Sequence, residues 1–312
     1  MSRQQRMQSE TTGSNQSSFD LQAQIPQSYP FVKWAGGKTQ LLPELEKYIP
    51  DNFTRYFEPF LGGGAFFFYL VSSKQLKFTA YLSDVNKELI NAYKVIKDDV
   101  EALIELLRIH EKGYKLNPNE YYYKLRAEPK PPTDVESAAR FITLNKTCYN
   151  GLYRVNKDGM FNVPIGRYKN PLICDSKNLR NVSIALRHTN AHLFANNYQE
   201  TLELSREGDF IYLDPPYKPT SITANFTSYT NDGFGDKDQI ALYEIFKKLD
   251  RKGCKIMLSN SDTPFIRELY HDFKEYTSQV SVLRAINCKP TRRIGHTELL
   301  VRNYEKEVAL AE

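Results

Sequence analysis

Two periodicities of hydrophobic and polar residues alternate along this chain. Short apolar runs, rich in β-branched and aromatic residues, predict strands at 56–58, 81–83, 192–195, 210–213, 255–259, 277–282 and 297–303. Apolar residues three and four positions apart predict two helices over 86–110, meeting near Asp98-Asp99, and a further helix over 135–145. Strands that alternate with helices indicate an α/β fold.

Both ends of the chain lack this pattern. Residues 1–30 are rich in glutamine and serine and contain few apolar side chains. A segment that buries little apolar surface cannot offset the entropy lost on ordering. We therefore predict a disordered tail over 1–30, a fold that begins at Phe31, and a second short tail over 305–312.

The strand at 210–213 is followed by Asp214-Pro215-Pro216-Tyr217. Proline has no N–H and a fixed φ, so the pair ends the strand and holds the next backbone rigid. Asp214 and the carbonyl oxygen of Pro215 or Pro216 can accept hydrogen bonds. The ring of Tyr217 can stack on a flat partner, so the set suits a planar heterocycle with an exocyclic amine. The structural alternative is a strand that ends in a proline turn, with Asp214 as a cap.

A glycine-rich turn follows the strand that contains Phe57 and Glu58. Gly62 to Gly64 allow a tight turn and a close approach of the backbone to a ligand. About 20 residues later Asp84 ends the next strand, which is the separation at which α/β nucleotide folds place a carboxylate on ribose hydroxyls. The turn is not the full dinucleotide fingerprint, but its combination with Asp84 and the later proline turn indicates a nucleotide-like ligand.

Basic and aromatic side chains gather between 140 and 171. Six basic residues and one acidic residue give this stretch an excess of five, equal to the net charge of +5 of the whole chain. The basic residues are Arg140, Lys146, Arg154, Lys157, Arg167 and Lys169, and the interleaved rings are Tyr149, Tyr153, Phe161 and Tyr168. Two β-like runs around Asn156-Lys157-Asp158-Gly159 predict a hairpin. Cations and rings on a narrow element favour DNA binding; the alternative is a solvated hairpin whose rings pack on neighbouring helices.

Composition excludes several other classes of protein. No stretch reaches the apolar length of a membrane span, and no signal region follows Met1. The four cysteines lie far apart without a C-x-x-C pair, and the five histidines show no ligand spacing. Neither a disulfide framework nor a metal site is predicted, which fits a reducing cytoplasm.

Taken together, the motifs resemble those of DNA adenine-N6 methyltransferases of the Dam type, the alpha group, which use S-adenosyl-L-methionine. The resemblance covers about residues 31–304, and its motifs follow one another in the order of that group. They are Phe31-Val32-Lys33-Trp34-Ala35-Gly36-Gly37-Lys38, the turn from Phe57 to Gly64, Asn150-Gly151-Leu152-Tyr153-Arg154, the run from Phe161 to Tyr168, Asp214-Pro215-Pro216-Tyr217, and Leu258-Ser259-Asn260.

This resemblance implies a Rossmann-like S-adenosylmethionine methyltransferase sheet of the α/β class. Residues 31–86 and 190–304 would form the catalytic domain, and 87–189 an inserted DNA-recognition domain with helices and a β-hairpin. The expected activity is methyl transfer to N6 of an adenine flipped out of double-stranded DNA, in GATC. We also expect the protein to act on DNA as a monomer, without a metal ion and without membrane contact. Its expected location is the cytoplasm, in association with the nucleoid.

The resemblance also implies roles for individual residues. The expected cofactor-binding residues are Trp34, Lys38, Phe57, Glu58, Gly62, Gly64, Asp84 on the ribose, and Asp214. The expected catalytic residues are Asp214, Pro215, Pro216 and Tyr217. Asp214 and a proline carbonyl would accept the two hydrogens of the adenine amine, and Tyr217 would stack on the base.

DNA contacts are carried over in the same way. The positions of Lys33, Leu152, Arg154 and Pro164 face bases of GATC in the family, that of Tyr149 inserts into the stack, and Asn150, Arg167 and Tyr168 are further DNA-binding candidates. Arginine can bind guanine bidentately, and leucine and proline suit a thymine methyl group. The stretch 219–229 resembles the mobile loop after the active site, and the basic run 289–296 is a candidate second backbone clamp.

Other functions are compatible with parts of the sequence. Gly36-Gly37-Lys38-Thr39 mimics the end of a phosphate loop, but that motif needs a glycine at Val32 and a preceding strand, so ATP hydrolysis is disfavoured. A non-catalytic DNA-binding protein, or a methyltransferase for RNA, cytosine or another DNA site, is the second alternative. The chain is compatible with a solitary methylase and with the partner of a restriction nuclease.

Overall fold

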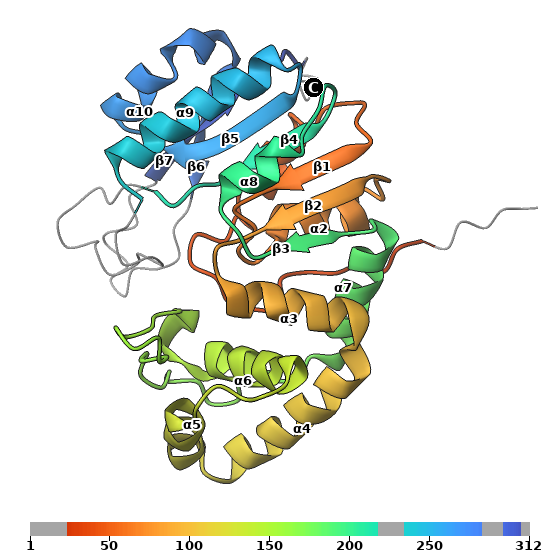
Figure 1. The fold of residues 1–312 in the computed structure, drawn as a ribbon, viewed down its shortest axis with the longest axis vertical. Helices are drawn as coiled ribbons and strands as arrows, with labels where there is room; N and C mark the ends of the chain where they lie inside the picture. Colours follow the sequence, from red (N-terminus) through yellow and green to blue (C-terminus); the bar gives the residue numbers. More distant parts are fainter. Residues whose placement is uncertain (1–23, 218–233, 283–295, 307–312) are drawn as a thin grey trace, which may run out of the picture.

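The structure, a computed structural model, describes residues 24–217, 234–282 and 296–306. Within these ranges seven strands form a single sheet in the order β3-β2-β1-β4-β5-β7-β6 (Figure 1). The strands are β1 Arg55–Glu58, β2 Thr79–Ser83, β3 His192–Phe194, β4 Phe210–Leu213, β5 Lys255–Ser261, β6 Thr277–Val282 and β7 His296–Arg302. Each strand predicted from an apolar run is present.

The sheet is mixed. Strands β1 to β5 run parallel to one another, whereas β7 is antiparallel to both β5 and β6. The carboxyl ends of the parallel strands therefore meet at one edge, together with the amino end of β7. The strand order reverses between β1 and β4, and open α/β sheets bind ligands at this switch point.

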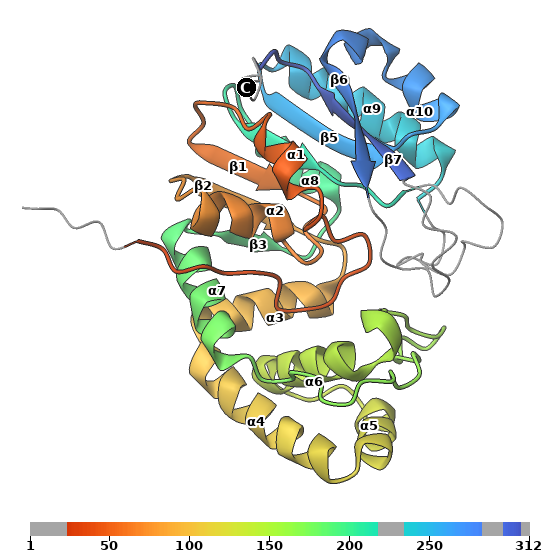
Figure 2. The same ribbon diagram turned by 180° about the vertical axis from the view of Figure 1, so that it is seen from behind.

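Helices cover both faces of the sheet (Figures 1 and 2). One face carries α1 Leu42–Glu46, α2 Ala65–Phe68 and the π-helical turn η1 Tyr69–Ser73; the other carries α8 Tyr198–Glu203, α9 Asp236–Arg251, α10 Pro264–Leu269 and η4 His271–Tyr276. Along β4, Phe210 and Tyr212 pack into one core while Ile211 and Leu213 pack into the other. This explains the unbroken apolar run, since a strand covered on both faces needs no polar position.

The insert between β2 and β3 is mainly helical. It comprises α3 Lys87–Asp98, α4 Val100–Leu116, α5 Pro118–Ala127, α6 Asp134–Thr147, the 3-10 turn η2 Tyr149–Gly151 and α7 Ser176–His188. The predicted break at Asp98-Asp99 is confirmed. Helix α6 begins at a capping box, in which Thr133 and Glu136 satisfy each other's backbone N–H groups. Figure 1 shows α4, α5 and α6 as a lobe below the sheet, with α3 and α7 between them and the sheet.

The predicted hairpin is present, but it is held by isolated bridges instead of two continuous strands. Val155 bridges Phe161, and the N–H of Asn156 donates to the carbonyl of Met160 at 2.8 Å. The N–H of Asn162 also donates to the carbonyl of Arg154 at 3.0 Å. Beyond this bond the ladder stops: the carbonyl oxygen of Val163 accepts from two α5 side chains, and Pro164 has no N–H to pair.

Residues 24–30 differ from the predicted tail, because they are ordered against the rest of the protein. The N–H of Ile25 donates to the side chain of Gln75, and the N–H of Tyr29 donates to that of Asn178. The hydrogen bonds from these side-chain amides stabilise the ordered segment, which has too few apolar side chains to be held by burial alone. At the other end Lys306 pairs with Asp51. Residues 1–23 and 307–312 of the predicted tails lie outside the described residues.

Across the described ranges, no helix has the combination of length and apolar character that spanning a membrane requires.

Candidate active site

Asp214 lies directly after β4 and is held by two partners on the same oxygen. The Nζ of Lys38 lies 2.8 Å from its Oδ1, and the hydroxyl of Ser259 donates to Oδ1 at 2.9 Å. Lys38 also donates to the carbonyl of Gly36 at 3.0 Å. The side chains of Lys38 and Asp214 are only 8% and 18% exposed, so the pair lies in a poorly solvated environment.

The charge of Asp214 depends on this setting. Burial raises the pKa of the carboxyl above its ordinary value, and the nearby Glu298 raises it further, while Lys38 and Ser259 lower it. Lys38 is therefore the main group that opposes the effect of burial on the pKa of Asp214, a role that the sequence analysis did not assign to it.

Tyr217 is fixed at two points. Its hydroxyl donates to Oε2 of Glu298 at 2.6 Å, and the ammonium of Lys38 lies 4.4 Å from the centre of its ring. Glu298 is buried and lies opposite Ser261 in the antiparallel pair of β5 and β7. Because β7 runs opposite to the parallel strands, its amino end brings Glu298 to their carboxyl ends. Sequence reasoning missed Glu298, although an acid inside an apolar strand was a signal.

The proline turn is positioned from α9 and β5. The side-chain amide of Gln239 donates to the carbonyl oxygen of Pro216 at 3.4 Å, and Asn260 donates to Gln239 at 2.9 Å. Gln239 and Asn260 are fully buried. The Leu258-Ser259-Asn260 motif thus supports the active-site turn through two side chains.

The glycine turn after β1 contains Gly62 and Gly64 and brings two further residues of the expected cofactor site, Asp84 and Trp34, next to Gly62. The N–H of Gly62 donates to Oδ2 of Asp84 at 3.0 Å, and Oδ1 of Asp84 accepts from the N–H of Asn86 at 2.9 Å. Gly62 has a φ of +48°, and a Cβ there would lie 2.7 Å from Trp34 Cδ1. Gly64 has a φ of +68°, and a Cβ there would lie 2.7 Å from the hydroxyl of Tyr93. Only glycine fits at either position.

The two residues before the turn point to opposite faces of the sheet. Phe57 stacks on Tyr81 with ring centres 4.5 Å apart and is fully buried, so its side chain belongs to the core and only its backbone can face a cofactor. Glu58 accepts from the hydroxyl of Tyr56 at 2.7 Å. Burial, with a smaller contribution from the charge of Asp214, raises the pKa of Glu58 to about 8, against the opposing effect of that hydrogen bond.

Replacing Glu58 with glutamine is expected to change the pH dependence of stability. Since the pKa is raised on folding from 4.5 to about 8, wild-type stability is full below pH 4.5 and falls until about pH 8. The neutral amide still accepts from Tyr56 but does not ionise. Urea unfolding at several pH values should show the variant gaining a few kcal/mol over wild type across this window. Glu105→Gln, at an exposed site on α4, is the control; parallel curves for wild type and Glu58→Gln would contradict the assignment.

Several of the residues expected to bind DNA surround the base of the hairpin. The ammonium of Lys33 lies 3.5 Å from the centre of the Tyr168 ring, and the N–H of Tyr149 donates to the carbonyl of Pro164 at 2.8 Å. The side chain of Tyr149 is 46% exposed, and Asn150 beside it has a φ of +54°. The structure thus gathers five of the expected DNA-binding residues and presents Tyr149 to solvent; the five are Lys33, Tyr149, Asn150, Pro164 and Tyr168.

The hairpin carries the other expected contacts. Arg154 is exposed, and its Nε donates to Oδ1 of Asn162 at 2.6 Å while Nη2 donates to the carbonyl of the same residue. Arg167 is also exposed, and Leu152 is half-buried. Asn162 therefore orients the Arg154 guanidinium across the hairpin, which the sequence did not indicate.

Not every basic or aromatic residue of the insert is available to DNA. Arg140 is buried and donates to the carbonyls that end α5, those of Leu125, Arg126 and Glu128, so it caps a helix and contacts no phosphate. Tyr153 stacks on Trp34 at 6.2 Å and donates to Glu88 at 2.8 Å. The packing alternative therefore holds for these side chains, because neighbouring helices offer them partners.

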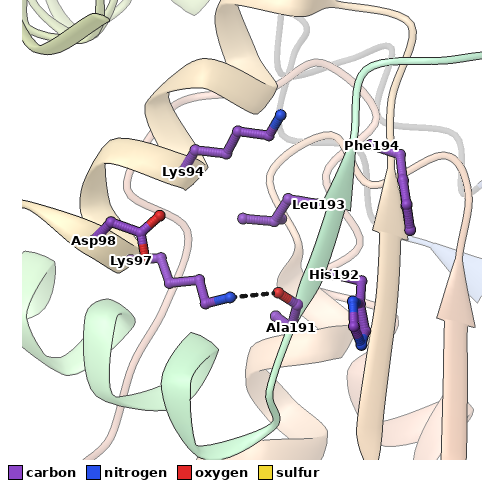
Figure 3. A pocket seen from close by; sticks show the side chains of 7 residues that line it. All are labelled: Lys94, Lys97, Asp98, Ala191, His192, Leu193 and Phe194. Atoms are coloured by element: carbon purple, nitrogen blue, oxygen red, sulfur yellow. Dashed lines mark hydrogen bonds between the residues drawn. The ribbon is translucent and has the colours of Figure 1, made fainter.

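A hollow of about 280 Å³ lies away from these residues, at the open edge of β3 (Figure 3). It is lined by Lys94, Lys97, Asp98, Ala191, His192, Leu193 and Phe194, and Lys97 donates to the carbonyl of Ala191 at 2.8 Å. Lysines beside an edge strand discourage pairing with another chain, which gives Lys94 and Lys97 a structural role at this edge.

Over the part of the chain that the structure describes, no cluster of three or more histidine, cysteine or acidic side chains is arranged to hold a metal ion. The expected mobile loop at 219–229 and the basic run at 289–295 lie outside the described residues.

The sheet order, the ligand edge at its switch point and the glycine turn define a Rossmann-like methyltransferase fold. A family model of the D12 class N6 adenine-specific DNA methyltransferases matches residues 34–283, and the chain belongs to this family. This confirms the resemblance stated from the motifs: the protein is an adenine-specific DNA methyltransferase, and DNA is its substrate.

Named relatives extend over most of the chain. Type II methyltransferase M.MjaIII of Methanocaldococcus jannaschii is 46% identical over 88% of this chain and 99% of its own length. Type II methyltransferase M1.LlaDCHI of Lactococcus lactis is 42% identical over 88% and 95%. The DNA adenine methylase of Haemophilus influenzae is 35% identical over 87% and 92%.

Proposed function

We propose that the protein, as a monomer, transfers a methyl group from S-adenosyl-L-methionine to N6 of an adenine flipped out of duplex DNA, with GATC as the target. The observation that carries this proposal is the buried Asp214 carboxylate beside the rigid proline turn and the ring of Tyr217. Together they provide acceptors for an amine and a platform for a flat base.

The residues around the glycine turn fit the cofactor. Asp84 has one hydrogen bond on each carboxylate oxygen, so each keeps acceptor capacity for a ribose hydroxyl. Gly62, which has no room for a side chain, lets the backbone approach closely, and Trp34 lies against it. When bound, S-adenosyl-L-methionine supplies a methyl group on a positively charged sulfur. The contribution of this chain is placement and electrostatics.

The adenine amine is activated by two acceptors. Its lone pair is conjugated with the ring, which makes it a poor nucleophile. Both partners of Asp214 occupy Oδ1, so we assign Oδ2 to the amine. Gln239 engages the carbonyl of Pro216, so we assign the second acceptor to Pro215. With both hydrogens held, the nitrogen pyramidalises and directs its lone pair away from the ring.

Base flipping exposes the amine, since the target atom lies inside the duplex stack. Lys38 and Glu298 hold the Tyr217 ring, one from a face and one at the hydroxyl, and the other face stacks on the adenine. The exposed ring of Tyr149 fills the gap left in the stack.

Recognition of GATC is supported by the residues that match the Dam-type motifs. Lys33, Leu152, Arg154 and Pro164 stand at the positions that face bases in those enzymes. Arg154 retains N–H groups beyond those held by Asn162, which suits a guanine edge.

The proposal is tested by incubating the full-length protein with labelled S-adenosyl-L-methionine and two matched plasmids, one with GATC sites and one without. Mapping of the modified bases is expected to show N6-methyladenine in GATC only. Methylation of adenine at another sequence would overturn the target, and label on cytosine would overturn the reaction.

Replacing Arg154 with alanine is expected to relax discrimination at one guanine of the target by about 1–3 kcal/mol. The measurement is kcat/KM on duplexes that carry each single base change. Lys157→Ala on the same hairpin is the control for a lost charge. Uniform weakening on all sequences would instead show that Arg154 contacts a phosphate.

A further inference from the structure

Three side-chain amides hold the segment 25–33, which crosses the molecule in front of α7 and α3 (Figure 2). Each amide accepts from the N–H and donates to the C=O of the same residue, as a neighbouring strand would. The pairs are Gln75 with Ile25 at 2.9 and 3.0 Å, Asn178 with Tyr29 at 3.1 and 3.0 Å, and Asn145 with Lys33 at 2.8 and 2.8 Å. The three residues held in this way are four positions apart. The last of them, Lys33, belongs to the group of expected DNA-binding residues at the base of the hairpin.

Asn145 differs from the other two amides because it also forms a hydrogen bond to Gly151, in the turn that leads into the hairpin. Its Nδ2 also donates to the carbonyl of Gly151 at 3.1 Å, and the residue is 1% exposed near the end of α6. One buried amide therefore joins Lys33 to the turn from which the hairpin starts.

The contact between these two backbones leaves no space for a side chain. Gly151 has a φ of +64°, and a Cβ there would lie 2.3 Å from Cβ of Lys33. The ammonium of Lys33 rests over the ring of Tyr168 at 3.5 Å. Asn145 thus holds the main chain of Lys33, and Tyr168 holds the far end of its side chain.

We propose that Asn145 is a positioning residue for DNA sequence recognition, which sets Lys33 against Gly151 so that the Lys33 ammonium meets one base of the target. This rests on the proposed function, in which Lys33 faces a base. In this proposal Asn145 does not contact DNA. It affects recognition only by fixing the position of the Lys33 backbone.

Asn145→Asp tests the proposal with little change of shape. A carboxylate can still accept from the N–H of Lys33, but it cannot donate to the carbonyls of Lys33 and Gly151, and its oxygen would face theirs. Asn178→Asp is the matched control, because it breaks the same kind of pair four residues earlier, at Tyr29.

The measurement is kcat/KM of the full-length protein on the target duplex and on duplexes with each single base change. Asn145→Asp is expected to lower discrimination about tenfold at one position, the position affected by Lys33→Ala. The double variant should lose no more than Lys33→Ala alone. Asn178→Asp should keep the wild-type profile.

A readout separate from activity guards against general damage. Trp34, the single tryptophan of the chain, lies beside Lys33 and against the glycine turn, so its fluorescence reports cofactor binding in each variant. Unchanged cofactor affinity with altered discrimination supports the proposal. If thermal unfolding shows that Asn145→Asp does not fold, Asn145→Ala removes the same donors without adding a charge.

Three results with the two asparagine variants would overturn the inference. They are an unchanged profile in Asn145→Asp, an equal loss on all duplexes, and the same change in Asn178→Asp. If Lys33→Ala alters no position while wild type methylates its target, the inference fails and the proposed reaction stands. If wild type methylates no adenine in duplex DNA, the proposed function fails as well.

Discussion

Asp214→Ala is expected to lower methyl transfer by about 10²–10⁴-fold while binding of DNA and cofactor stays measurable. The carboxylate is the only charged group of the Asp-Pro-Pro-Tyr turn. In the proposed reaction it accepts a hydrogen bond from one N–H of the amine and stabilises the positive charge that develops on the nitrogen. Its position is set by Lys38 and Ser259. Because Asp214→Ala leaves the poorly solvated Lys38 ammonium without this partner, the stability of the variant is measured alongside its activity.

Single-turnover methylation measures this loss without interference from product release. Asp214→Asn is the matched variant, since it keeps the size and one acceptor oxygen but not the charge, and it should retain more activity than alanine. Fluorescence of 2-aminopurine at the target position reports base flipping separately. Near-normal turnover of Asp214→Ala would remove Asp214 from the reaction.

Lys38→Met is expected to give the second largest effect. It leaves the Asp214 carboxylate buried without its cation, which costs about 3–5 kcal/mol of unfolding free energy when only one partner is removed. Because Lys38 lowers the pKa of Asp214, its removal raises that pKa further. Fewer molecules then carry the carboxylate at neutral pH, and turnover there should fall by about 10²-fold.

The pH profile distinguishes this cause from simple damage. The acidic limb of kcat should move to higher pH in Lys38→Met, and part of the activity should return as Asp214 ionises. Lys38→Met combined with Asp214→Asn should recover stability but not activity, because no unpaired buried charge remains. A loss of turnover that is equal at every pH would contradict the role assigned to Lys38.

The strands of the sheet were predictable because each carries its pattern locally. β4 is apolar along its whole length because it is buried on both faces, and β1 and β5 contain the shorter apolar segments 56–57 and 256–258. The turns after these strands contain glycine or proline for reasons of backbone geometry. Asp84 and Asp214 could be placed at the ligand edge because carboxyl ends of parallel strands meet there.

The supporting side chains were not predictable, because their partners are distant in sequence. Asn145 and Lys33 are 112 residues apart, and Tyr217 and Glu298 are 81 apart. Arg140 lies in the basic and aromatic part of the sequence that suggested DNA binding. In the structure its guanidinium instead donates to carbonyl groups at the end of α5. A single buried amide or carboxyl side chain does not change the hydrophobic pattern of its helix or strand. Its hydrogen-bond partners are therefore visible only in the folded structure.

The order of the polar segment 24–30 was also not predictable from its own sequence. Its composition is that of a disordered tail, and nothing within it forms a helix or strand. Gln75 and Asn178, from two other parts of the chain, supply the hydrogen bonds that a strand would otherwise supply.

A crystal structure of the protein with target duplex and a non-reactive cofactor analogue tests the central claim most directly. We expect an extruded adenine stacked on Tyr217, with N6 about 3 Å from Oδ2 of Asp214 and from the carbonyl oxygen of Pro215, and facing the sulfur of the analogue. A base that stays in the duplex, or an analogue bound away from the glycine turn at Gly62, would contradict it.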